Sequence, residues 1–272
     1  MTLGRVAFEG HDCVRLERGA ERLHVTVDVG PRVLGLEGAG ANVLAVTPDA
    51  SLAFPGGGTC HLVGGHRLWA APEVPAVTYA PDDAPCAVTE VPDGARFAAP
   101  VDAAGLARTI EVRASASGWS VAHAVANLGG APVVLAPWAI TQVRLGGEAF
   151  LPLPREGEGP TADRALVLWP YTELSDPRYR FTDDGVAIAG TPGPATKVGA
   201  APGAGWVAYR IDGEVLRIAA EGSGDGARAD LGAATQVYAC ETFLELETLG
   251  PLRSLAPGEV ATHRETWTLG AA

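Results

Sequence analysis

The chain has 272 residues, 47% of them hydrophobic, so it can bury a sizeable core without disulfide or metal support. Its net charge is −12, from 32 acidic and 20 basic residues. An acidic surface repels phosphate backbones and anionic lipids, which argues against nucleic acid or a membrane as the partner. A neutral ligand such as a sugar is indifferent to this charge.

The N-terminal segment carries charges every few positions and has no apolar run of signal-peptide length. No stretch approaches the roughly 18 apolar residues of a membrane span. The four cysteines, Cys13, Cys60, Cys86 and Cys240, are scattered without a CxxC pair, which disfavours a zinc site and a disulfide framework. We therefore expect a cytoplasmic protein with reduced thiols.

Short segments of alternating apolar and polar residues, separated by 35 glycines and 21 prolines, predict β-strands throughout the chain. The expected strands, in chain order, are Leu23–Val29, Arg32–Leu36, Asn42–Val46, Arg108–Ala114, Trp119–Asn127, Pro132–Ala136, Ala165–Trp169, Gly205–Ile211, Glu214–Ala219, Gln236–Glu247 and Ala261–Leu269. Asp212-Gly213 predicts a tight hairpin, and Gly190–Gly205 is expected to be a loop. Eleven or more strands fit a large sandwich or barrel, so we expect a single all-β domain over residues 1–272.

Two strands are regular enough for their faces to be assigned, because successive side chains alternate between faces. The faces so assigned are Trp119, Val121, His123 and Val125 in the first strand, and His263, Glu265, Trp267 and Leu269 in the second. The opposite face of the second strand, which is rich in threonine, is expected to be wet.

A glycine-rich segment, Gly57–Glu73, contains two histidines, an arginine, a tryptophan and a glutamate. We expect a loop in which Trp69 stacks on a sugar ring and Arg67 donates hydrogen bonds to its hydroxyls, since glycines allow close approach of a ligand. The alternative is a structural loop in which Arg67 pairs with Glu73.

Two further segments carry aromatic residues beside polar ones. In Ala136–Gln142, Trp138 and Gln142 share one strand face, as sugar contacts or as core. In Leu168–Arg180, Trp169 and Tyr171 suit a sugar platform, because a sugar ring has apolar faces and polar edges. The alternative for the second segment is a solvated surface cluster.

The segment Cys240–Leu255 places Glu241, Glu245 and Glu247 on one face if it forms a strand. A carboxyl that faces a semi-enclosed pocket has a raised pKa and can act as a general base near neutral pH. Three carboxylates on one face also describe a solvated strand.

No nucleophile-elbow, zinc-protease, dinucleotide or phosphate-loop motif occurs. Asp163, Asp176, Asp183 and Asp184 lack calcium-loop spacing. We therefore expect no metal and no cofactor.

The run Phe243–Leu269, together with GGHRLWAAPE at 64–73 and PWAITQV at 137–143, resembles a bacterial branch of the aldose 1-epimerase, or galactose mutarotase-like, family. The resemblance extends from about Leu23 to the C-terminus. It implies a β-supersandwich with a sugar site on the concave face of a sheet. It also implies that a glutamate takes the proton from the anomeric hydroxyl while a histidine protonates the ring oxygen.

Mapped by motif, the resemblance places the base at Glu245, or at Glu247 if the strand register shifts, and the substrate-binding arginine at Arg67, beside His66. The position that matches the family's acid histidine is Trp138. The proton must then come from elsewhere, such as His66 or His61. The remaining residues expected to bind substrate are Glu73, Gln142, Trp169, Tyr171 and Lys197, the only lysine of the chain.

The sequence thus favours a small-molecule carbohydrate as partner and acid–base chemistry at an anomeric centre. A second interpretation is a non-catalytic sugar-binding or sensing protein on the same scaffold. A glycan lyase is less well supported, because sugar-acid substrates favour several basic residues in the site.

Overall fold

The computed structural model describes residues 3–155, 157–222 and 226–272. Its regular structure is almost entirely antiparallel β-strand, which confirms the all-β prediction. The helical segments in the described residues are α1 (Pro75–Thr78) and the single 3₁₀ turn η1 (Asp230–Gly232). No helix in the described part of the chain is both long enough and apolar enough to cross a bilayer.

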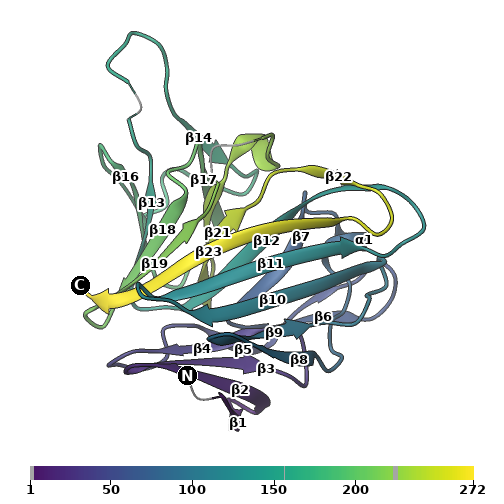
Figure 1. Ribbon diagram of the computed structural model, residues 1–272. Helices are drawn as coiled ribbons and strands as arrows, with labels where there is room; N and C mark the ends of the chain where they lie inside the picture. Colours follow the sequence, from purple (N-terminus) through teal and green to yellow (C-terminus); the bar gives the residue numbers. More distant parts are fainter. Residues whose placement is uncertain (1–2, 156, 223–225) are drawn as a thin grey trace.

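Most strands belong to two large sheets, which form the two layers seen in Figure 1. The first sheet has eleven strands: β22 (Arg253–Leu255) pairs with β12 beside the main path. The order of that path is β1 (Leu3–Phe8), β2 (His11–Arg18), β3 (Glu21–Thr26), β4 (Val33–Glu37), β7 (His66–Ala71), β12 (Val133–Arg144), β21 (Phe243–Leu249), β20 (Thr235–Ala239), β17 (Thr196–Ala201) and β14 (Ala165–Leu168).

The second sheet has ten strands, and a separate hairpin is formed by β5 (Val46–Ala53) and β6 (Thr59–Gly64). The order in the ten-stranded sheet is β15 (Tyr179–Phe181), β16 (Gly185–Ala189), β13 (Glu148–Pro152), β18 (Trp206–Ile211), β19 (Glu214–Ala220), β23 (Val260–Ala271), β11 (Trp119–Asn127), β10 (Leu106–Ala114), β9 (Gly94–Ala98) and β8 (Ala87–Val91).

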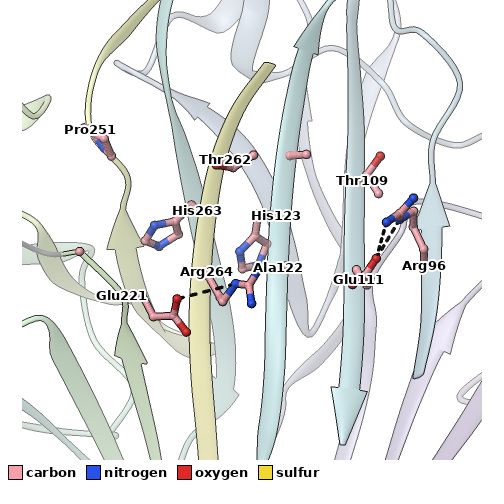
Figure 2. A pocket seen from close by; sticks show the side chains of 12 residues that line it. Arg96, Thr109, Glu111, Ala122, His123, Glu221, Pro251, Thr262, His263 and Arg264 are labelled. Atoms are coloured by element: carbon pink, nitrogen blue, oxygen red, sulfur yellow. Dashed lines mark hydrogen bonds and ion pairs between the residues drawn. The ribbon is translucent and has the colours of Figure 1, made fainter. Parts of the chain in front are cut away.

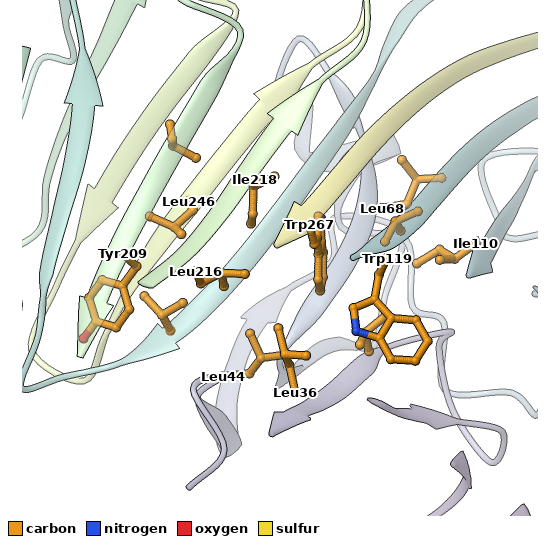
Figure 3. Packing of buried hydrophobic residues seen from close by; sticks show 14 of the residues in the cluster. Leu36, Leu44, Leu68, Ile110, Trp119, Tyr209, Leu216, Ile218, Leu246 and Trp267 are labelled. Carbon is orange, nitrogen blue, oxygen red and sulfur yellow. The ribbon is translucent and has the colours of Figure 1, made fainter. Parts of the chain in front are cut away.

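Large apolar side chains from both sheets fill the space between them. Trp119 and Trp267 are cross-strand partners in the ten-stranded sheet and are fully buried. They belong to one core cluster with Leu36, Leu68 and Leu246 of the eleven-stranded sheet (Figure 3). Burial of one such side chain contributes about 1.5–3 kcal/mol, so this core holds the two layers together.

Local sequence explains the most regular elements. Strand β11 spans the predicted residues 119–127 and alternates buried with half-buried positions along its length. The hairpin between β18 and β19 turns at Asp212 and Gly213, whose φ angles of 50° and 80° are those of a type I′ turn.

The glycine-rich segment 57–73 is not a loop, as the sequence suggested, but contains β6 and β7. Every residue of β7 is buried. A strand covered on both faces has no polar face, so its sequence lacks the alternation that marks a half-buried strand. For the same reason the expected loop at 190–205 hides β17, of which five of six residues are buried.

Other boundaries also differ from the prediction. The segments 132–136 and 136–142 form one continuous strand, β12. The segment 236–247 is two strands, β20 and β21, because the chain reverses where the Cys240 amide donates to the Phe243 carbonyl. The expected strand Asn42–Val46 is wrong except at two positions: Leu44 forms an isolated bridge with Val143, and Val46 is the first residue of β5.

Candidate functional site

Polar and aromatic side chains converge on the face of the eleven-stranded sheet that points away from the other sheet. Residues paired across antiparallel strands lie on the same face. One such row runs across β12, β21, β20 and β17 through Gln142, Glu245, Tyr238 and Lys197. The strand order therefore brings together residues that are up to about a hundred positions apart in sequence.

The neighbouring row across β7, β12 and β21 contains Arg67, Ile140 and Glu247. Beyond it, Trp69 on β7 lies opposite Trp138 on β12, and their ring centroids are 5.7 Å apart. Two cations, two carboxyls and two indoles thus lie within three adjacent rows.

These rows border a cavity of about 260 Å³, which the β5–β6 hairpin and the segment after α1 close from the side. The volume is slightly below the roughly 300–1,000 Å³ of most ligand pockets, so it suits a small ligand. The cavity is lined by Leu52, Leu62, Arg67, Trp69, Glu73, Tyr79, Trp138, Tyr171, Ala195, Lys197, Tyr238, Phe243 and Glu245.

Glu245 is the carboxyl of β21 that lines the cavity. Its Oε1 atom accepts hydrogen bonds from Arg67 Nη2 at 2.8 Å and from Gln142 Nε2 at 3.0 Å. Thr47 donates to Gln142 Oε1 at 3.1 Å, which fixes the amide with its nitrogen toward Glu245. Two donors therefore hold one oxygen of Glu245, while the side chain still lines the cavity.

Glu247 lies behind Glu245 and is fully buried. Its Oε2 atom accepts from Lys197 Nζ and from Trp138 Nε1, both at 2.7 Å. Burial is the main cause that raises the pKa of Glu247 to about 7, and the charge of Glu245 adds to it against the opposing charge of Lys197. Within the described residues, Oε1 of Glu247 has no hydrogen-bond partner.

The two cations of the site each lie over indole rings. Lys197 Nζ is 4.7 Å from the ring centroid of Trp138 and 4.6 Å from that of Trp169. The Arg67 guanidinium is 4.2 Å from the ring centroid of Trp69. Such cation–π contacts attract a cation to the ring face and leave its N–H groups free to donate hydrogen bonds elsewhere.

Arg67 is 2% exposed, yet two of its nitrogens, Nε and Nη1, have no hydrogen-bond partner in the described part of the chain. An unsatisfied buried donor costs about 1–3 kcal/mol. A ligand with oxygen acceptors in the adjacent cavity would relieve this cost.

Three tyrosines also line the cavity, and the sequence analysis identified only Tyr171. Burial is the largest cause that raises the pKa of Tyr79, Tyr171 and Tyr238, so all three are neutral at physiological pH. The Tyr79 hydroxyl donates to Glu73, an exposed carboxylate at the rim. These hydroxyls supply further donors and acceptors for a polar ligand.

Of the predicted site residues, seven line the cavity: Arg67, Trp69, Glu73, Trp138, Tyr171, Lys197 and Glu245. Gln142, Glu247 and Trp169 do not line it but contact residues that do. The alternative interpretation, in which Arg67 pairs with Glu73, is wrong, because Arg67 instead forms its ion pair with Glu245.

His66 does not reach this cavity. It precedes Arg67 on β7 and therefore points to the opposite face, between the sheets, where its Nδ1 lies 2.9 Å from Thr141 Oγ1. Burial lowers its pKa to about 3, so it is neutral near pH 7. His61 is exposed on β6, and no histidine is among the described residues that line the cavity.

Several lining residues were not among the site residues that the sequence analysis identified. Tyr238 lies on β20 two residues after Gln236, so the two side chains share a face. This face could have been inferred if the expected strand 236–247 had been divided into β20 and β21. Tyr79 and Leu52 come from the segment after α1 and from the hairpin, where nothing in the local pattern indicates the cavity.

A larger cavity, about 660 Å³, lies elsewhere, on the ten-stranded sheet (Figure 2). Its charged residues already form ion pairs with one another, Arg96 with Glu111 at 2.7 Å and Arg264 with Glu221 at 3.7 Å. Its lining contains no tryptophan, tyrosine or phenylalanine. It therefore lacks the indole and phenol stacking surface of the smaller cavity, and its unpartnered buried nitrogen, among the described residues, is His123 Nδ1 rather than an arginine donor.

No protein-family model and no curated protein sequence matches the chain. Solved structures do match it, at low sequence identity. A putative aldose 1-epimerase from Escherichia coli K12 is 12% identical with a TM-score of 0.57, and the match covers 96% of this chain and 99% of that one.

A putative mutarotase from Salmonella typhimurium is 11% identical with a TM-score of 0.60, with 99% and 94% coverage. A galactose mutarotase-like protein from Lactobacillus casei is 9% identical with a TM-score of 0.52, with 95% and 100% coverage. Along nearly its whole length, the chain has the β-sandwich fold of galactose mutarotase-like proteins, as its sequence predicts.

Proposed function

We propose that the protein accelerates the interconversion of the anomers of a small sugar, in the manner of an aldose 1-epimerase. The observation that carries this proposal is the position of Glu245, on the cavity and held through one oxygen by Arg67 and Gln142. A fixed carboxylate beside a small cavity with indole walls suits abstraction of a proton from a sugar hydroxyl.

In the proposed reaction, Glu245 removes the proton of the anomeric hydroxyl, and the C1–O5 bond breaks with its electron pair moving to O5. A proton donor supplies O5 with a proton, which leaves an open-chain aldehyde. Rotation about C1–C2 exposes the other face of the carbonyl. Attack by the O5 hydroxyl then closes the ring, and both protons return to their sources.

We assign the proton donor to Lys197 in place of the expected histidine. The Lys197 ammonium lines the cavity and is supported by Trp138 and Trp169. It also donates to Glu247 at 2.7 Å, and that carboxyl, with a pKa raised to about 7, can return a proton to it. Glu245 and the pair of Lys197 with Glu247 thus divide the base and acid roles.

The test is exchange NMR on a panel of free aldoses, with and without the protein. We expect faster anomer interconversion with the wild-type protein and a loss of about 10²–10⁴-fold in Glu245→Gln. Glu241→Gln is the matched control, because Glu241 is exposed and does not line the cavity. Equal turnover by Glu245→Gln and the wild type would contradict the role of Glu245.

A second candidate function is sugar binding without catalysis. It is favoured by the absence of histidine among the described residues that line the cavity, while Trp69 and Trp138 still offer a stacking surface. This function predicts saturable sugar binding with no change in the rate of anomer interconversion for any aldose of the panel.

A further inference from the structure

Three side chains of metal-ligating types lie close together between the two sheets, on the opposite side of β7 from the cavity that Glu245 lines. They are His66 from β7 in the eleven-stranded sheet, and His123 from β11 and Glu265 from β23 in the ten-stranded sheet. One ligand atom from each lies within 4.8 Å of the other two. All three residues are at most 1% exposed.

We propose that His66, His123 and Glu265 bind one divalent transition-metal ion, with zinc the best match, and that this ion links the two sheets. Two imidazole nitrogens and one carboxylate form a donor set that zinc uses in proteins. The Nε2 atoms of the two histidines face each other at 2.7 Å, and Glu265 Oε2 lies 4.0 Å from His123 Nε2.

Charge is the first argument for a cation. A buried carboxylate is costly unless a positive group compensates it. In the described part of the chain, Glu265 forms no ion pair with arginine or lysine, and its hydrogen-bond donors are the uncharged Thr248 and Trp267. A divalent ion between Glu265 and the two imidazoles would supply the missing positive charge.

The second argument is that outer hydrogen bonds hold two of the three proposed ligands, His66 and Glu265, whereas His123 Nδ1 has no partner among the described residues. His66 Nδ1 lies 2.9 Å from Thr141 Oγ1, which leaves Nε2 to face the centre. The Trp267 indole donates to Glu265 Oε2 at 2.8 Å, and Thr248 donates to Glu265 Oε1. Metal ligands in proteins are usually oriented by such outer hydrogen bonds.

His263, the cross-strand partner of His123, is not assigned as a ligand. Figure 2 shows the two rings side by side on neighbouring strands. The Nε2 atom of His263 is 2.6 Å from Thr248 Oγ1, so it supports the threonine that holds Glu265. His263 is thus a positioning residue one step outside the proposed ligand set.

The three donor atoms fit one ion after small movements. Zinc lies about 2.0–2.2 Å from nitrogen and oxygen ligands, so two ligands of one ion are up to about 4 Å apart and usually about 3.3 Å apart. The two imidazole nitrogens, 2.7 Å apart, would separate by about half an ångström. The carboxylate oxygen would approach His123 Nε2 by about 0.7 Å from 4.0 Å, and ligand atoms as far apart as 4.8 Å would approach by about 1.5 Å. The competing arrangement is a hydrogen bond between two neutral imidazoles, which needs no ion.

The test is the metal content and thermal stability of protein produced with added zinc. We expect roughly one zinc ion per wild-type chain, a lower Tm after chelation, and recovery of the Tm when zinc is restored. Glu265→Gln and His123→Gln should lose the ion. His24→Gln is the matched control, because His24 is buried on β3, where it stacks on Phe8.

Cobalt provides a measurement that does not depend on the variants folding. Wild-type protein loaded with Co²⁺ should show the visible absorption of a nitrogen- and oxygen-ligated site at one equivalent. A wild-type chain with less than about a tenth of an equivalent of zinc, no Tm response to zinc or cobalt and no such absorption would overturn the proposal and leave the hydrogen-bonded arrangement.

Discussion

Glu245 and Glu247 extend from the same face of β21, two residues apart, but only Glu245 lines the cavity. Glu245 is held by Arg67, whereas Glu247 is fully buried and held by Lys197. The two carboxyls of one strand therefore have different surroundings, and burial raises the pKa of Glu247. Such divergence between neighbouring carboxyls is the usual basis for separate acid and base roles.

The first prediction concerns the pH dependence of stability. Burial raises the pKa of Glu247 from 4.5 to about 7, so the folded protein binds an extra proton between these values. The resulting stability is fully present below about pH 4.5 and is lost as the pH rises through about 7, a change of roughly 3 kcal/mol. Glu247→Gln resembles the protonated form and should remove this dependence.

Urea unfolding of the wild type and of Glu247→Gln at pH 5 and pH 8 measures this effect. We expect similar stabilities at pH 5 and a more stable variant at pH 8. A variant that is markedly less stable than the wild type at pH 8 would show that the ionised pair with Lys197 outweighs the burial of Glu247.

The second prediction is that Arg67→Lys is not a conservative change. Arginine both donates to Glu245 and stacks on Trp69, and a lysine cannot reproduce the planar fork. Loss of one hydrogen bond to a charged group, about 1.5–3 kcal/mol, should lower kcat/KM for the best aldose by about 10–100-fold. Arg180→Lys, an exposed arginine on β15, should leave kcat/KM unchanged. Equal effects of the two changes on kcat/KM would contradict a role for Arg67 in binding or catalysis.

The regular strands could be predicted from the sequence because their pattern is local. Strand β11 alternates strictly, so its bounds and faces follow from periodicity alone. The shared face of Glu245 and Glu247 follows from the same period of two. Which of the two reaches the cavity depends on Lys197 and Trp138, which come from β17 and β12, and no local pattern contains that information.

The sequence did not indicate which face of its strand His66 points to. Adjacent residues of a strand point to opposite faces, so a motif that contains both His66 and Arg67 can place only one of them in a given site. Because β7 is buried on both faces, neither residue has an exposed neighbour that would indicate which way it points. The position of His66 between the sheets could be learned only from the assembled layers.

The third prediction uses intrinsic fluorescence. Trp69 and Trp138 line the cavity, so a bound sugar should change their emission in a saturable way. Trp138→Phe should remove most of this change, whereas Trp206→Phe should retain it, since Trp206 lies on β18 in the other sheet. A sugar response that persists in Trp138→Phe and disappears in Trp206→Phe would place the ligand on the ten-stranded sheet.

The fourth prediction tests how the fold positions β7. Gly65 joins β6 to β7 with a φ of +64°, and a Cβ atom there would lie 2.1 Å from the Val33 carbonyl oxygen on β4. In Gly65→Ala, the alanine must adopt a left-handed backbone conformation, and its Cβ clashes with a main-chain oxygen, which no side-chain movement can relieve. We expect a loss of at least about 2 kcal/mol of unfolding free energy.

Gly19→Ala is the matched control, because Gly19 has a φ of +59° but no atom within 4 Å of the added carbon. Only the backbone cost of about 1 kcal/mol should appear there. Urea unfolding of both variants separates the two contributions. An equal loss of unfolding free energy in Gly65→Ala and Gly19→Ala would mean that β4 and β7 are less closely packed than they are in the structure. The backbone of β7 would then not hold Arg67 against Glu245.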